Sequence, residues 1–248
     1  MLKLFRSIRK KLLSENKTNQ YLKYAIGEIF LVVIGILIAL QINNWNQNRL
    51  VTNQEHKLLL ELKTDLKITQ EELSLDIFYG DSVYNLAENL LTYLDTITQT
   101  NYDKDVYSSK FMIAMGNVKL YPRTIAFENL KSLGIEIVKN DSIRNLILDI
   151  YDRRLPRITF WENEVTAREN EIKNMMASHF QLKKDNTMFV DDYYYLIPYA
   201  IEPKSITEFK NRIGLLQGDR KSTNGLYQEL DARISHLIEL LDLEYIKT

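Results

Sequence analysis

The stretch YAIGEIFLVVIGILIALQI, residues 24–42, decides the fold of the N-terminal part of this chain. Its nineteen residues, if helical, span roughly 28 Å, close to the ~30 Å hydrocarbon core of a bilayer. Ten of the residues from 29 to 40 are Ile, Leu, Val or Phe, and together they favour membrane insertion by roughly 3–6 kcal/mol. Glu28 opposes insertion, but near one end it costs less than the ~2.5–3.5 kcal/mol of a central charge. The stretch therefore predicts a transmembrane helix.

Two other interpretations of this stretch stay open. A buried core helix is the first, although core helices of soluble proteins are rarely apolar on every face. A cleaved signal peptide is the second. The apolar run starts late and is long for a signal peptide, and no small-x-small cleavage site follows Leu40.

The residues before the apolar stretch predict its orientation. Residues 1–23 contain seven Lys or Arg and a single acid. The positive-inside rule then places the N-terminus in the cytoplasm, with Trp45 anchored at the outer interface. Phe5, Ile8 and Leu12 repeat at helical spacing, so the tail is either an amphipathic helix on the inner leaflet or a disordered segment. The cations expected at the membrane surface are Lys3, Arg6, Arg9, Lys10 and Lys11.

One face of the predicted transmembrane helix carries small and polar residues. Glu28, Val32, Gly35 and Ala39 share this face, and Gly35 and Ala39 form a small-x-x-x-small pattern that allows close helix approach. The pattern favours self-association or docking on a membrane partner, with Glu28 in the interface. Alternatively, Glu28 reaches the inner headgroups and Gly35 is incidental.

Residues 24–46, with the basic leader before them, resemble the N-terminus of a family of uncharacterised Bacteroidota membrane proteins, the domain of unknown function numbered 6090. A second, looser similarity runs through Phe127, Leu130, Gly134, Val138, Asn140, Arg144 and Tyr151. The resemblance implies a bacterial inner-membrane protein with a periplasmic helical domain. The domains would be a cytoplasmic tail, 1–23, a transmembrane helix, 24–42, and a periplasmic domain, 43–248. The resemblance implies no activity.

The remainder of the sequence reads as helix. The whole chain has only eight glycines and four prolines, and strand-like alternation is scarce. A heptad seam runs through Leu59, Leu62, Leu66, Thr69 and Leu73. Gly80-Asp81-Ser82 predicts a break and a new N-cap, followed by a second amphipathic helix. Its apolar positions are Val83, Leu86, Leu90, Leu94 and Ile97.

Further helices follow a polar segment, residues 99–122, in which a short helix is possible near 106–115. A helix over 123–133 should end at Gly134, and Asn140 or Asp141 should cap the next helix, which Pro156 punctuates. A long helix comes next, with Ile158, Trp161, Val165, Ile172, Met175 and Phe180 on its apolar face.

The last third of the chain holds an irregular segment, residues 183–204, and a C-terminal helix capped by Ser205. Gly214, Gly218 and Gly225 favour breaks in this helix. However, positions 209 to 241 keep one 4-3 register, apolar except at Arg220 and Thr223, which favours a single helix to about 246. The expected fold is all-α: a transmembrane helix followed by an antiparallel helical bundle with long amphipathic helices.

Chemical signatures are scarce in the sequence. His56, His179 and His236 lack metal-ligand spacing. No phosphate-binding loop or nucleophile elbow occurs, and no cysteine is present. We therefore expect no catalytic, cofactor or metal site. Residues 43–248 hold 25 basic and 31 acidic residues, so we expect no nucleic-acid partner.

Three charged or aromatic groups allow more than one interpretation. Glu162, Glu164, Glu169 and Glu171 are expected to form a solvated, ion-paired face. Tyr193, Tyr194 and Tyr195 either form a binding loop or pack on the bundle. The third group consists of four arginines: Arg144, Arg153, Arg154 and Arg157. They either bind an anion or pair with carboxylates. The acidic excess of residues 43–248 favours pairing with carboxylates.

The function that fits these observations is a membrane-anchored structural or interaction module that binds itself or another envelope protein. The alternative is a periplasmic ligand sensor. A cytoplasmic tail of 23 residues is too short for an output domain, so a sensor would need a membrane partner to carry its signal. An enzyme is not expected.

Overall fold

The computed structural model describes residues 18–98, 116–185, 193–198 and 203–246, in two compact units that meet in sequence between Lys57 and Leu58. The predicted all-α class is confirmed, with one two-stranded sheet added. The elements are α2 (Thr18–Thr96), α4 (Ile125–Leu133), the 3-10 helix η1 (Ile135–Ile137), α5 (Asp141–Leu148), the π-helix η2 (Asp149–Arg154), α6 (Leu155–His179), β1 (Phe180–Asp185), β2 (Tyr193–Pro198) and α7 (Pro203–Ile246).

The first unit, up to Lys57, is described as the N-terminal part of α2. Its large apolar side chains face outward all around the helix. Phe30 is 67 % exposed, Leu37 58 % and Ile42 61 %. The helix is long and apolar enough to cross a membrane, with a mean hydropathy of 2.5 in its most apolar window and none of that window buried. Among the described residues of this unit, 18–57, no other element covers the apolar stretch that the sequence predicts to be transmembrane.

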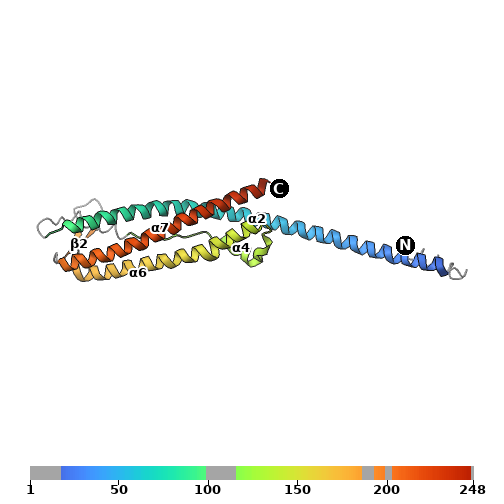
Figure 1. The fold of residues 1–248 in the computed structure, drawn as a ribbon, viewed down its shortest axis with the longest axis horizontal. Coiled ribbons are helices and arrows are strands. Elements are labelled where there is room, and N and C mark those ends of the chain that lie inside the picture. The colour runs from blue at the N-terminus through green and yellow to red at the C-terminus, as the bar shows by residue number, and fades with distance from the viewer. Residues whose placement is uncertain (1–17, 99–115, 186–192, 199–202, 247–248) are drawn as a thin grey trace. The chain divides into compact units, whose positions relative to one another are not determined.

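The second unit, from Leu58, packs α2, α6 and α7 side by side (Figure 1). Two ion pairs show how α2 and α7 run relative to each other. Lys63 of α2 pairs with Asp242 near the C-terminal end of α7, and Asp95 at the C-terminal end of α2 pairs with Lys210 near the start of α7. These two helices are therefore antiparallel. The predicted bundle is confirmed.

Two clusters of buried apolar side chains form the core of the second unit. The larger cluster joins α2, α4, α5, η2, the start of α6 and the C-terminal half of α7, and includes Leu62, Leu130 and Leu237. The smaller cluster joins the C-terminal parts of α2 and α6 to the N-terminal part of α7, for example through Leu90, Ile172 and Ile213. Burying apolar area of this kind is the main favourable term in folding.

The break predicted at residues 80–82 is wrong, because α2 continues through it to Thr96. Gly80 lies where α2 approaches α7: a Cβ at this position would lie 3.2 Å from Asn224 Oδ1. Asp81 accepts a hydrogen bond of 2.6 Å from Asn224 Nδ2. The glycine therefore provides space for a helix contact and does not form a turn.

Several predicted helix ends are confirmed. The α4 helix ends at Gly134, whose φ of 94° suits glycine. Asn140 caps α5, since its side chain accepts from Ser142 N and Ile143 N. The helix α7 is single, as its register predicted, but it begins at Pro203, two residues before the predicted cap Ser205.

Pro156 does not separate two helices as expected, because α5, η2 and α6 follow one another without a break. The π-helical turn lies just before the proline. A proline lacks the N–H that an α-helix needs and its ring crowds the preceding turn, so a local widening of the helix accommodates it.

The prediction that residues 183–204 are irregular is also partly wrong. Its described part contributes to an antiparallel hairpin in which β1 pairs with β2, from Phe180 opposite Pro198 to Asp185 opposite Tyr193. The tyrosines and the isoleucine in β2 are residues that favour strands. The short helix considered near residues 106–115 lies outside the described residues.

Candidate functional site: a buried polar layer

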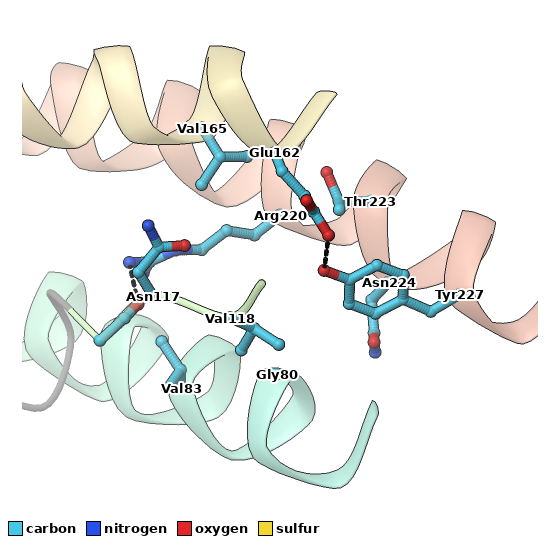
Figure 2. A pocket seen from close by; sticks show the side chains of 11 residues that line it. Gly80, Val83, Asn117, Val118, Glu162, Val165, Arg220, Thr223, Asn224 and Tyr227 are labelled. Atoms are coloured by element: carbon cyan, nitrogen blue, oxygen red, sulfur yellow. Dashed lines mark hydrogen bonds between the residues drawn. The ribbon is translucent and has the colours of Figure 1, made fainter. Parts of the chain in front are cut away.

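Between the two apolar clusters, the three long helices bury polar side chains. Glu162 and Glu169 of α6 are 4 % and 1 % exposed, and Arg220 of α7 is 9 % exposed. Figure 2 shows Glu162 and Arg220 together with Asn224 and Tyr227 of α7, which lie next to them. We refer to these five side chains as the polar layer. Buried charges of this kind are costly unless they are paired and hydrogen-bonded.

Arg220 and Glu169 form a buried ion pair with an N···O distance of 2.7 Å. The same Arg220 Nη2 donates to the backbone carbonyl of Gly116, also at 2.7 Å. Burial raises the pKa of Glu169, and the hydrogen bond and charge of Arg220 lower it in part. The arginine thus compensates both a desolvated carboxylate and a carbonyl of a segment without regular structure.

Glu162 fills a similar role on the other side of the layer. Its Oε1 accepts from Leu120 N at 2.9 Å and from the Tyr227 hydroxyl at 2.5 Å. Burial raises the pKa of Tyr227, and the hydrogen bond to Glu162 raises it further. The tyrosine therefore stays protonated and donates to the carboxylate.

The segment 116–124, which has no regular structure, is held by side chains of the bundle. Besides the bonds to Gly116 and Leu120, the Arg123 N–H donates to Thr69 Oγ1 at 3.0 Å. Just beyond the segment, Ala126 N donates to Asp65 Oδ2 at 3.0 Å. Buried backbone groups need such partners. The polar layer, together with Asp65 and Thr69 of α2, therefore holds this segment against the bundle, which is a structural role.

A cavity of about 30 Å³ lies within the layer, beside Gly80, Asn224 and Tyr227. Asn224 Oδ1 is buried and has no hydrogen-bond partner within the described part of the chain. A cavity of this size holds water but not a metabolite. Asp76, on the neighbouring turn of α2, has a raised pKa because of burial and the nearby charges of Glu162 and Glu72.

Most residues singled out from the sequence do not meet in this layer. Glu28, Gly35, Ala39 and Trp45 lie on α2 in the first unit. A Cβ at Gly35 would meet nothing within 4 Å, and Arg49 lies 5.4 Å from the Trp45 ring centroid. The cations Lys3, Arg6, Arg9, Lys10 and Lys11 lie outside the described residues.

The tyrosines considered as a binding loop lie in strand β2. Tyr193, Tyr194 and Tyr195 pair along the backbone with Asp185, Lys184 and Lys183. The three residues are therefore part of a hairpin strand.

The four arginines considered as an anion site pair mostly with acids. Arg144 bonds Asp141, and Arg153 and Arg154 contact Asp149 at 3.1 and 3.3 Å. Three of the four arginines therefore each contact a carboxylate of the bundle.

The expectation of a solvated glutamate face is wrong for Glu162 and Glu169, although Glu164 and Glu171 are exposed. A signal for this burial was present in the sequence. Glu162 and Glu169 continue the 3-4 spacing of Ile158, Val165 and Ile172, which are all buried. This spacing predicts that both glutamates face the core. The polar positions 220 and 223, which interrupt the apolar face of α7, indicate where α7 could supply their partners.

Among known proteins, residues 28–196 match the family described as "Family of unknown function (DUF6090)". The matched range covers more than half of the chain and includes residues 28–46 of the first stretch on which the sequence resemblance rests, and all of the second stretch. No curated protein and no solved structure matches the chain.

Proposed function

Since the chain belongs to the family of unknown function DUF6090, which brings no activity with it, we propose that it is a membrane-anchored interaction module. Residues 24–42 cross the bacterial inner membrane, the basic tail stays in the cytoplasm, and the bundle lies in the periplasm. The observation that carries this proposal is the outward-facing apolar surface of α2, from Ile26 to Ile42. Such a surface is expensive in water and favourable in lipid.

The bundle supports an interaction role over an enzymatic one. The carboxylates of Glu162 and Glu169 already accept hydrogen bonds from the protein itself. In the part of the chain that the structure describes, no three His, Asp or Glu side chains gather where a metal could bind. The proposal therefore assigns no reaction to the polar layer.

Self-association would use the face of α2 that holds Glu28, Val32, Gly35 and Ala39. These positions recur every three or four residues and so lie on one side of the helix. Gly35 leaves the backbone open to close approach by a second helix. Glu28 would then share a polar interface with its copy or with a partner helix.

Because the protein has no cysteine, a single introduced cysteine reports one position without background. We expect Val32→Cys to form a disulfide-linked dimer on mild oxidation of native membranes. Phe30→Cys is the matched control, since it lies two residues away on the opposite face. Adding Gly35→Leu to Val32→Cys should remove most of the dimer.

Equal crosslinking at both positions would contradict the proposed face. Absence of any dimer, together with absence of a co-purifying membrane protein, would contradict the interaction module itself. Labelling of Ser74→Cys, but not Ser7→Cys, by an impermeant maleimide added to spheroplasts would support the proposed topology.

A further inference from the structure

A second, larger hollow lies away from the polar layer, between α5, η2 and the C-terminal half of α7. Its volume is about 360 Å³, within the ~300–1,000 Å³ range of small-molecule sites. Polar groups on its wall come from both sides: Ser142 and Asn145 from α5, and His236 from α7. Leu146 and Leu240 supply apolar surface. The hollow therefore combines a few polar groups with an apolar wall.

The π-helical turn gathers arginines at this hollow. Asp149, at the start of η2, contacts Arg153 Nε at 3.1 Å and Arg154 Nε at 3.3 Å. In an α-helix the residues four and five positions on point in clearly different directions. The wider π-turn, with its i→i+5 bonding, places both of them over the same residue. Arg233 of α7 adds a third guanidinium, 3.9 Å from Asp149.

The three arginines are not equivalent. Arg154 is only 11 % exposed, and its Nη1 bonds Glu229. Arg153 and Arg233 are 69 % and 48 % exposed and line the hollow. Each of them approaches Asp149 most closely through Nε and not through a terminal nitrogen of the guanidinium. Guanidinium groups held in this way match the oxygens of phosphates and carboxylates.

The charge of the wall favours an anion. The two arginines and Asp149 give the lining a net charge of +1 with His236 neutral, in a domain that is acidic as a whole. From this geometry we propose that the hollow binds a small molecule through a phosphate or carboxylate group, with Arg153 and Arg233 as its ligands. Asp149 holds both arginines in place, and Leu146 and Leu240 contact the apolar part of the ligand.

This proposal does not depend on the membrane anchor or on self-association. It would supply the ligand that the sensor alternative requires. The test uses the full chain in detergent, titrated with inorganic phosphate at constant ionic strength with chloride as the reference anion. We expect saturable binding by ³¹P line broadening, competition by succinate, and a rise in melting temperature of roughly 2–4 °C near saturation.

The arginine variants identify the site. Arg153→Gln with Arg233→Gln should weaken phosphate binding at least about tenfold, because two charge-assisted hydrogen-bond donors are lost. Lysine at both positions keeps the charge without the planar fork and should give an intermediate loss. Arg212→Gln is the matched control: this arginine pairs with Glu208 and Glu171 and lies outside the hollow.

Two outcomes would overturn the proposal: no saturable binding of phosphate or succinate, or equal affinity in the double glutamine variant. Repeating the titration in nanodiscs with and without anionic phospholipid identifies the source of the phosphate group. Weaker phosphate binding in anionic nanodiscs would identify a lipid headgroup as the ligand. Unchanged binding would identify a soluble molecule.

Discussion

The apolar clusters and the polar layer use equivalent helix positions in different ways. Leu62 and Leu73 of α2 face the partner helices at 3-4 spacing and are fully buried. Glu162 and Glu169 of α6 occupy the same kind of position, also almost without exposure. Helix periodicity therefore sets which positions face the core. The side chain then decides whether a layer is held by buried area or by specific hydrogen bonds.

The two kinds of layer should differ in what they tolerate. An apolar layer loses stability in proportion to the area and volume removed. A polar layer loses little when a whole pair is replaced, but much when one member is left without its partner. This difference can be tested with single and paired substitutions in the full chain.

The largest effect is expected for Arg220→Met. It leaves Glu169 buried without its partner and removes a donor from the Gly116 carbonyl. Breaking a buried pair in this way costs about 3–5 kcal/mol. Thermal and denaturant unfolding of the detergent-solubilised chain would measure the loss. The matched control Arg212→Met, also on α7, breaks only exposed pairs and should cost less than about 1 kcal/mol.

Replacing both members of the pair sharpens this test. Glu169→Leu combined with Arg220→Met removes the uncompensated carboxylate, so most of the lost stability should return. Recovery should be incomplete, since the Gly116 carbonyl still lacks its donor. If the double variant is as unstable as Arg220→Met, the buried charge is not the cause of the loss.

The next effect belongs to the apolar clusters. Leu62 is fully buried in α2, and Leu62→Ala should cost about 2–5 kcal/mol through lost burial and a cavity. Leu60, two residues away on the same helix, is 45 % exposed, and Leu60→Ala should stay within about 0.5 kcal/mol of wild type. Comparable losses at both positions in the same unfolding experiments would contradict the burial pattern.

Local and periodic features of the fold could be predicted from the sequence. The apolar stretch of residues 24–42, the caps at Gly134 and Asn140 and the single helix α7 each follow from neighbouring residues or from one repeating register. The register of α7 outweighed its three glycines because apolar side chains kept one face over the whole helix.

Features that depend on distant partners could not be predicted in this way. Gly80 was interpreted as a break because its contact, Asn224, lies on another helix far along the chain. The glutamates of the polar layer were interpreted by charge and not by spacing, and the charge was compensated by Tyr227 and Arg220 of α7. The pairing of β1 with β2 likewise depends on contacts across the hairpin.

The smallest expected effect is at Asp76, next to the polar layer in α2. Burial, with the charges of Glu162 and Glu72, raises its pKa above the usual 3.8. The folded chain thus holds this proton more tightly than the unfolded chain, so ionised Asp76 opposes folding at neutral pH. Asp76→Asn should therefore stabilise the protein at pH 7, by less than about 1 kcal/mol because the side chain is only half-buried.

The pH dependence separates this electrostatic effect from a packing effect. The gain from Asp76→Asn should be full above the raised pKa of the folded state and should vanish as the pH falls to about 3.8. Melting temperatures at pH 7.5, 5 and 4 would follow it. Glu71→Gln, at an exposed position of α2, makes the same charge change as a control. A gain in melting temperature that stays constant over this pH range would show that Asp76→Asn changes stability through packing. It would also show that the charge of Glu162 in the polar layer does not destabilise ionised Asp76 of α2.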